Sequence, residues 1–241
     1  MLIFFALIGL LACQQPSDKL ILLSKDPSKS YTTWILSLDS TLRIREFYSI
    51  PRDSMNHFLR KCAGIIMTGG EDVNPELYGK PGYKDVCELP DNFRDSIEKV
   101  MILFAMTNKR PLLGICRGQQ IINAVNGGTL IPDIPSSIPH SVIPHRSKSD
   151  SAHLVTALEN SWMDFPGESR IHWVNSRHHQ SVDRVADGFK IAAMSADGII
   201  ESIEIDDSLQ HPFVVCVQWH PEGLRDSLSG VLGHKFLETL N

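Results

Sequence analysis

The sequence predicts an α/β fold in three layers, with a central, mostly parallel sheet flanked by helices. Three observations lead to this prediction. Short apolar runs such as residues 112–115 have the length and composition of buried parallel strands. Amphipathic helical segments alternate with these runs, most clearly at residues 91–107. The chain has 241 residues, of which 42% are hydrophobic, and this suits one large domain or at most two small ones.

The first half of the chain alternates strands and helices. Residues 20–23 predict a buried first strand, and residues 30–39 a short helix with Trp34, Ile35 and Leu38 inward. A partly exposed strand is expected at 42–48. Either Asp53 or Ser54 is a suitable cap for the next helix. Residues 63–67 then form an apolar strand that runs into a turn at Gly69-Gly70.

The second half adds a helix, a rim and a group of later strands. The helix at 91–107 has an apolar stripe that includes Ile97, Val100 and Met101, and Pro111 leads into the central strand. Four Ile-Pro steps after Gly128 favour an ordered rim without helix. The remaining expected strands lie at 151–158, 170–174, 189–194, 199–205 and 212–219, and the closing helix lies at 227–240.

The N-terminal segment, residues 1–19, is expected to be separate from the domain at 20–241. Residues 1–12 are apolar and too short to cross a bilayer, which takes about 20 residues. They have the length of a signal-peptide core. With Ala12-Cys13 and the polar residues that follow, they resemble a bacterial lipoprotein signal, although no Lys or Arg precedes the core. The resemblance implies export and a lipid membrane anchor at Cys13; a cytoplasmic location is the alternative.

The charge distribution bears on possible partners. The net charge is −5 and the basic residues are scattered, so no nucleic-acid surface is expected. The cysteines other than Cys13 are at 62, 87, 116 and 216, without a C-x-x-C pair or dense framework. We therefore expect no essential disulfide.

Cys116 is the candidate nucleophile. It follows the apolar run 112–115 and precedes a helix-like segment, with Gly114 and Gly118 two residues away on either side. Most unpaired cysteines are small buried hydrophobes. Here, however, a sharp strand-to-helix turn with small neighbours favours a reactive side chain at its tip. The helix dipole favours a thiolate, and the N–H of Arg117 can face an oxyanion.

His220 is the candidate base. It ends an apolar strand, so in a parallel sheet it would emerge at the same edge as Cys116. Pro221 forces His220 into an extended conformation, and side chains two residues apart in extended chain share a face. Glu222 can therefore orient the imidazole, which gives a Cys116–His220–Glu222 triad.

Two loops are candidates for binding. The turn at Gly69-Gly70 can present backbone N–H groups to a ligand as a second oxyanion donor. Residues 175–180 form a polar cluster without periodicity, typical of a binding loop. His178 and His179 are adjacent, so they point in opposite directions and are not expected to share a metal ion. No zinc-type spacing is present, and we expect neither metal nor cofactor.

These motifs resemble a known superfamily. Gly114-x-Cys116-x-Gly118-x-Gln120 with Trp219-His-Pro-Glu222 is similar to the class I glutamine amidotransferase-like fold, which is flavodoxin-like. More narrowly, four stretches resemble the γ-glutamyl-γ-aminobutyrate hydrolase (peptidase C26) family. They are Thr68-Gly-Gly-Glu-Asp-Val-Asn-Pro75, Cys116-Arg-Gly118, Val174-Asn-Ser176 with His178-His-Gln180, and Glu201-Ser-Ile-Glu204. The resemblance runs from about residue 60 to the C-terminus, and residues 20–60 match poorly.

The resemblance implies a reaction and a set of site residues. Cys116 would attack the γ-carbonyl of a small γ-glutamyl amide, Gly70 and Arg117 would hold the oxyanion, and His220 would transfer protons. Further contacts to the glutamyl group are implied for Gln120 and the loop with Asn175, Ser176, His178 and His179. Relatives often form homodimers. Two alternatives stay open: a glutaminase subunit that delivers ammonia to a partner, and a non-catalytic exported binding lipoprotein.

Overall fold

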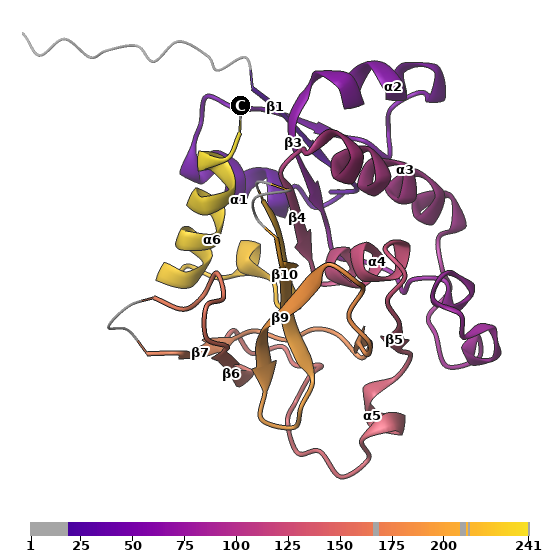
Figure 1. Cartoon of the computed structure of the whole chain (residues 1–241), viewed down its shortest axis with the longest axis vertical. Coiled ribbons are helices and arrows are strands. Elements are labelled where there is room, and N and C mark those ends of the chain that lie inside the picture. The colour runs from indigo at the N-terminus through magenta and orange to yellow at the C-terminus, as the bar shows by residue number, and fades with distance from the viewer. Residues whose placement is uncertain (1–18, 166–168, 208–210, 212, 241) are drawn as a thin grey trace, which may run out of the picture.

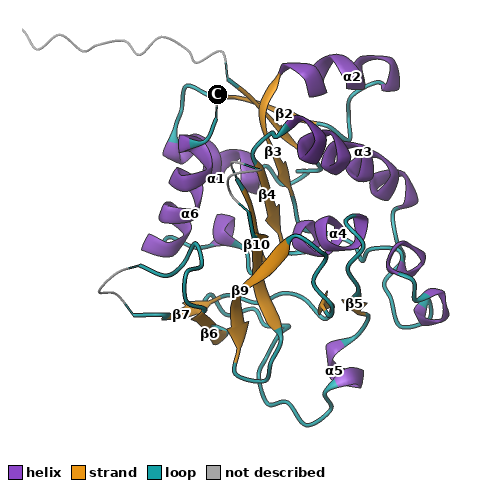
Figure 2. Cartoon of the chain, in the orientation of Figure 1, coloured by secondary structure: helices purple, strands orange, loops and turns teal. Residues whose placement is uncertain are grey.

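The computed structural model describes residues 19–165, 169–207, 211 and 213–240. Two sets of helices cover the two faces of one sheet in this part of the chain (Figure 1, Figure 2). Helices α1 (Ser30–Leu38) and α6 (Ser227–Glu238) lie on one face. Helices α2 (Arg52–Lys61), α3 (Asn92–Asn108) and α4 (Arg117–Val125) lie on the other. The predicted three-layer α/β sandwich is thus confirmed.

The core of the sheet is parallel. Strands β2 (Arg43–Glu46), β1 (Leu20–Leu23), β3 (Cys62–Met67), β4 (Leu112–Ile115) and β11 (Val214–Val217) are neighbours in this order, and all four pairings are parallel. In the register, Val217 lies opposite Ile115. Because the strands are parallel, the segments that follow β3, β4 and β11 leave the sheet at the same edge.

The sheet continues beyond β11 with antiparallel strands. These are β10 (Ile200–Ile205), β9 (Phe189–Ser195), β6 (His153–Ala157) and β7 (Ile171–Val174). A short ladder of β5 (Leu130–Ile131) and β8 (Ser181–Val182) joins β10 at its start. The hairpin expected between β9 and β10 is present, and Gly198 takes a φ of +87° in its turn. The sheet is therefore mixed, with a parallel core.

Successive residues of the parallel strands face two separate hydrophobic cores. In β1, Ile21 and Leu23 pack in the core beneath α1 and α6, whereas Leu20 and Leu22 pack in the core beneath α2, α3 and α4. Alternation across the pleat sends neighbouring side chains to opposite faces. Covering both faces therefore requires the continuous apolar runs that the sequence shows.

Three local expectations differ from the structure. Helix α2 begins at Arg52 with Pro51 at its N-cap position, so Asp53 lies inside the first turn and no side chain caps the helix. The rim after Gly128 contains a one-turn helix, α5 (Ile134–Ser137), which Asp133 caps by accepting from the Ser136 N–H at 3.0 Å. Val100 in α3 is 49% exposed and lies outside the apolar stripe.

The N-terminal segment with Cys13 lies outside the described residues. Among the helices of residues 19–165, 169–207, 211 and 213–240, none is long and apolar enough to cross a membrane.

Candidate active site

Cys116 lies at a strained turn between β4 and α4. Its φ of +53° and ψ of −109° are unusual for a residue with a side chain, and such strain is typical of functional turns. Its N–H donates to the Val217 carbonyl at 2.8 Å, so the hydrogen bonding between β4 and β11 continues as far as Cys116. A Cβ at Gly118 would lie 2.1 Å from the Met67 carbonyl oxygen. Only glycine fits there, which explains one of the two flanking glycines.

His220 and Glu222 follow β11, the strand beside β4. The Nδ1 atom of His220 lies 2.7 Å from Oε1 of Glu222, and Glu222 belongs to the short 3-10 helix η3 (Pro221–Gly223). Because Nδ1 faces Glu222, Nε2 is the nitrogen left for Cys116. The structure thus brings together the three residues of the predicted triad, and both Cys116 and His220 are buried.

The surroundings of His220 favour the imidazolium. Burial lowers the pKa of His220, but the thiolate charge of Cys116 and hydrogen bonds to Cys116 and Glu222 outweigh it and raise the pKa to about 10. The imidazole is therefore protonated at neutral pH when Cys116 is a thiolate. A protonated imidazole beside a thiolate is the pairing that activates a cysteine nucleophile.

Two backbone segments border the nucleophile as candidate oxyanion donors. The Arg117 N–H is the first of helix α4, and the first N–H groups of a helix have no acceptor within it. The other segment, Thr68–Gly70, follows β3, and Gly70 has a φ of +146°. The Gly69 N–H donates to the Tyr31 hydroxyl at 3.0 Å, so Gly70 is the candidate donor of this pair. A Cβ at Gly69 would lie 2.8 Å from His220 Cε1, which explains a glycine there.

A buried ion network supports both candidate donor segments. Glu98 in α3 pairs with Arg94 at 2.7 Å and also with Arg117. Arg94 in turn donates to the carbonyl oxygens of Thr68 and Gly69 at 3.0 and 2.8 Å. All three side chains of this network are at most 1% exposed. One carboxylate therefore joins the loop after β3 to the turn after β4.

Tyr31 in α1 is a site residue that the sequence interpretation missed. Its hydroxyl oxygen lies 3.4 Å from Nδ1 of His220, in addition to its bond with the Gly69 N–H. Burial first, and then the charges of Glu222 and Cys116, raise the pKa of Tyr31 well above its usual value, so the hydroxyl stays protonated. A signal was available: Tyr31 lies one helical turn before the inward-facing Trp34 and Ile35, and a buried tyrosine hydroxyl needs a partner.

Asn175 and Ser176 lie behind the site. Both are fully buried. The Asn175 amide bonds with the backbone of His220, and the Ser176 hydroxyl donates to the His145 carbonyl at 2.6 Å. We therefore assign these two residues a positioning role in place of the expected substrate contact.

His178 and His179 point to different surroundings, as the extended chain predicts. His179 lies between Asp72 and Asp133, with ring nitrogens 3.0 Å from an oxygen of each. Its hydrogen bonds to Asp72 and Asp133 outweigh burial and raise the pKa of His179 to about 9. His178 faces Glu201 instead, with Nε2 3.8 Å from a carboxylate oxygen.

A small pocket opens beside Cys116. Gln120 lines it and donates to the Gln180 carbonyl at 3.0 Å. The other lining residues are Gly70, Asp72, Glu88, Arg146, Arg177, His178, His179 and Gln180. Larger hollows lie elsewhere, such as one of about 610 Å³ between α1 and α6 that Glu222 also lines. We place the candidate substrate site in the smaller pocket because that pocket contains Cys116, and it offers charged groups of both signs.

Fold and site together define a class: α/β proteins of the class I glutamine amidotransferase type, with a cysteine at a strand-to-helix turn. A solved structure of this fold, the glutaminase domain of CTPS from Trypanosoma brucei, superimposes with a TM-score of 0.60. The superposition covers 92% of both chains, with 16% sequence identity.

The family follows from sequence comparison. The peptidase C26 family model matches residues 44–222, and this chain belongs to that family. A Schizosaccharomyces pombe protein that is named as a glutamine amidotransferase is 37% identical over 164 residues. That match covers 68% of this chain and 63% of the relative, so the chain spans less than two thirds of that relative's length. The γ-glutamyl-γ-aminobutyrate hydrolase PuuD of Escherichia coli K12 is 30% identical over 183 residues, which cover 70% of this chain and 67% of PuuD.

Proposed function

We propose that the protein is a cysteine-dependent hydrolase that cleaves the γ-glutamyl amide bond of small γ-glutamyl compounds and releases glutamate. The observation that carries the proposal is the convergence of Cys116, His220 and Glu222 at one sheet edge, beside the pocket just described. Membership of the peptidase C26 family, with a relative named as a γ-glutamyl-γ-aminobutyrate hydrolase, supports this choice of substrate class.

The proposed first step forms a thioester. The Cys116 thiolate attacks the γ-carbonyl carbon, and the carbonyl oxygen becomes an oxyanion facing the N–H groups of Gly70 and Arg117. The tetrahedral intermediate collapses as the C–N bond breaks, and His220 gives its Nε2 proton to the departing amine. The enzyme then carries a γ-glutamyl thioester on Cys116, and the free amine leaves.

The proposed second step consumes water. Neutral His220 takes a proton from water as the water oxygen attacks the thioester carbonyl. Collapse of this intermediate breaks the C–S bond, releases glutamate and restores the thiolate–imidazolium pair. Glu222 accepts a hydrogen bond from Nδ1 of His220 and stabilises the imidazolium, as a carboxylate does in related triads.

The charges of the pocket support an amino-acid head group as the bound part of the substrate. Arg177 can pair with an α-carboxylate, and Arg146 can do so by exchanging its 2.7 Å ion pair with Glu88. Asp72 and Glu88 lie in the same lining and can accept hydrogen bonds from an α-ammonium group. A zwitterion next to the scissile amide matches this arrangement of charges.

The substrate proposal is tested with a panel of γ-glutamyl amides and peptides, with glutamine included. Purified protein is incubated with each compound, and glutamate release is followed by mass spectrometry. We expect release from γ-glutamyl amides by the wild type and by Cys62→Ala, a matched change of a buried cysteine in β3, and none by Cys116→Ala. Turnover of glutamine alone, and only with a partner protein, would instead favour a glutaminase subunit. Absence of turnover with an unreactive Cys116 would favour a binding protein.

We also propose that the protein is exported and anchored by a lipid on Cys13. The support is the sequence pattern of residues 1–19. Labelled palmitate fed to producing cells should enter the wild type and not Cys13→Ala. Equal labelling of both proteins would contradict the anchor.

A further inference from the structure

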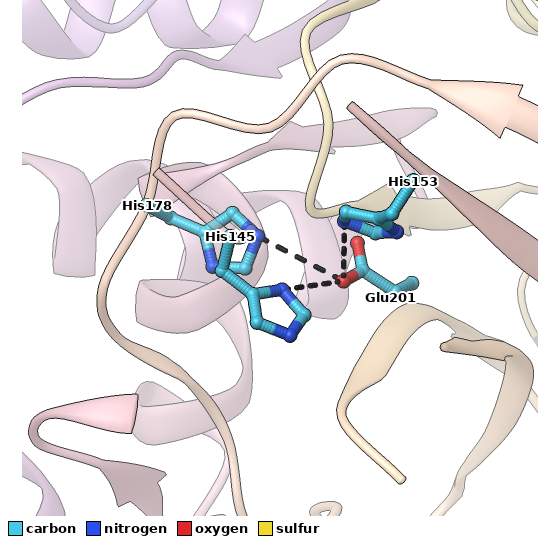
Figure 3. Close-up of side chains that lie close together, drawn as sticks. All are labelled: His145, His153, His178 and Glu201. Atoms are coloured by element: carbon cyan, nitrogen blue, oxygen red, sulfur yellow. Dashed lines mark ion pairs between the residues drawn. The ribbon is translucent and has the colours of Figure 1, made fainter. Parts of the chain in front are cut away.

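Four buried side chains outside the triad converge on one point (Figure 3). His145 comes from the rim, His153 from β6, His178 from the loop after β7 and Glu201 from β10. Each of the four is at most 5% exposed. One nitrogen of each imidazole and one oxygen of Glu201 lie within 4.8 Å of one another. The cluster therefore has the composition and compactness of a metal-ligand set.

The distances from Glu201 to the three imidazoles are close to those of tetrahedral coordination. Oε1 of Glu201 lies 3.3 Å from Nδ1 of His145, 3.4 Å from Nε2 of His153 and 3.8 Å from Nε2 of His178. Metal–ligand bonds of about 2.0–2.1 Å in a regular tetrahedron place the ligand atoms about 3.3–3.4 Å apart. Two of these three Oε1–nitrogen separations match this value, and the third exceeds it by a few tenths of an ångström. The four ligand atoms all lie within 4.8 Å of one another, so a bound ion would draw the imidazoles closer together.

The other nitrogen of each imidazole fixes the tautomer. Nδ1 of His178 faces the Gln180 carbonyl at 2.9 Å, and Nδ1 of His153 faces the Leu154 carbonyl at 3.3 Å. Nε2 of His145 faces the Asp197 carboxylate at 3.0 Å. Carbonyl and carboxylate oxygens only accept hydrogen bonds, so these nitrogens carry the N–H. In the neutral rings, the inward-facing nitrogens then have lone pairs.

Lone pairs from three nitrogens therefore meet a carboxylate oxygen in a buried space. Neither oxygen of Glu201 and none of the three inward nitrogens has a hydrogen-bond partner among the described residues. Burying a polar atom without a hydrogen-bond partner costs free energy. A proton or a cation must therefore lie between these nitrogens and the carboxylate. One proton would satisfy one nitrogen–oxygen contact, and each further proton would add a buried charge. A divalent cation would satisfy the three nitrogens and Oε1 of Glu201, and would balance the charges of Glu201 and Asp197.

We propose that His145, His153, His178 and Glu201 bind a Zn²⁺ ion in a closed structural site. Three imidazoles and one carboxylate are donors that zinc accepts, and four protein ligands leave no open position for catalysis. Asp197 and the two carbonyl groups act as the outer partners that orient the ligating imidazoles. The sequence pattern did not indicate this site because its ligands come from four separate segments.

The position of the site indicates what a bound ion would stabilise. His178 belongs to the segment that carries Asn175, and it also lines the pocket beside Cys116. The backbone of His178 donates to the His145 carbonyl at 2.9 Å, so two ligand segments already touch. A zinc ion would fasten this segment and the rim to β6 and β10. The inference does not depend on the proposed substrate.

The test uses the full chain without a histidine tag and with Cys116→Ala, so that metal binding by the thiolate is excluded. After chelator treatment and its removal, the protein is titrated with Co²⁺ and its visible spectrum recorded. We expect one Co²⁺ per chain with the strong visible bands of tetrahedral coordination, displacement by Zn²⁺, and a higher melting temperature with Zn²⁺ than without metal.

Variants identify the ligands. Glu201→Gln should abolish stoichiometric binding, whereas His140→Ala, an exposed histidine of the same rim, should leave it unchanged. Asp197→Asn keeps all four ligands and should weaken binding by about 10- to 100-fold, which keeps the test decisive if Glu201→Gln does not fold. Failure of the folded Cys116→Ala protein to bind Co²⁺ stoichiometrically would overturn the proposal. The proposal would also be overturned if the Asp197→Asn and Glu201→Gln proteins both bound Co²⁺ as strongly as the Cys116→Ala parent.

Discussion

The side-chain amide of Asn175 forms two hydrogen bonds with the backbone of His220. Its Nδ2 donates to the His220 carbonyl, and its Oδ1 accepts from the His220 N–H, both at 2.8 Å. His220 follows β11, where the regular ladder ends, so these bonds replace the sheet pairing that would otherwise hold its backbone. The polar loop after β7 therefore sets the position of the candidate base.

Replacing Asn175 should impair catalysis more than binding. In Asn175→Ala, the buried N–H of His220 loses its partner, and this costs about 1–3 kcal/mol. The His220 carbonyl keeps only the Gly223 N–H, at 3.1 Å. A displaced base should lower kcat by about 100-fold with a smaller change in KM. Steady-state kinetics on the best γ-glutamyl substrate measure this split. Asn108→Ala, an exposed asparagine in α3, is the control and should behave as the wild type. An unchanged kcat in Asn175→Ala would contradict the positioning role.

The glycine after the nucleophile should tolerate no side chain. In Gly118→Ala the new Cβ would lie 2.1 Å from the Met67 carbonyl oxygen, so β3 and α4 must separate. We expect a large loss of stability, of about 3 kcal/mol or more, by analogy with severe overpacking. Gly230→Ala in α6 is the matched change, because its Cβ meets no atom within 4 Å. It should stabilise the protein by about 0.5–1 kcal/mol. Urea unfolding of both variants measures the difference, and equal stabilities would refute the steric explanation.

The pKa of His220 should depend on Cys116. Its folded-state value of about 10 exceeds the usual 6.5, so protonated His220 stabilises the fold below pH 6.5, and this stabilisation is lost as the pH rises towards 10. Cys116→Ala removes the thiolate charge and should lower the pKa of His220. Titration of the imidazole nitrogen shifts by NMR measures the change. His179, whose pKa of about 9 comes from Asp72 and Asp133, should not change and is the internal control. An unaltered His220 titration would exclude a thiolate–imidazolium pair.

Tyr31 should position the loop after β3. Tyr31→Phe keeps the ring and removes the acceptor of the Gly69 N–H. We expect kcat to fall about tenfold, the equivalent of one lost hydrogen bond of about 1–1.5 kcal/mol, with KM nearly unchanged. Tyr83→Phe, which alters a half-exposed tyrosine, should have no effect. If both variants match the wild type in kcat, Tyr31 has only a packing role.

Much of the fold was predictable because the parallel strands lie between two helical layers. Burial on both faces selects continuous apolar runs, as in residues 20–23 and 112–115, and these are distinct in the sequence. The turn at Cys116 was equally predictable from the sequence. The close approach of residue 118 to Met67 allows no Cβ, so the sequence must have a glycine there. The one-turn helix α5 was not, because four residues hold no periodic pattern and an Asp133 cap alone does not indicate a helix.

The site was predictable only in part. Cys116, His220 and Glu222 follow strand ends, and parallel strands bring their ends to one edge. The contacts of Asn175, Tyr31 and Arg94 are long-range pairings across layers, which local sequence does not encode. A polar residue such as Asn175 looks the same in the sequence whether its amide meets a substrate or the backbone of His220. The histidine–glutamate cluster was hidden for the same reason.

In the proposed mechanism, Cys116 carries the γ-glutamyl group between the two steps. Rapid mixing with a good substrate, followed by acid quenching and peptide mass mapping, measures it directly. We expect the peptide with Cys116 to gain the mass of one glutamyl group, and the modification to disappear with hydroxylamine, which cleaves thioesters. Cys116→Ala should show no modification at any residue. Glutamate release without any adduct on Cys116, or an adduct on another residue, would contradict the proposed mechanism.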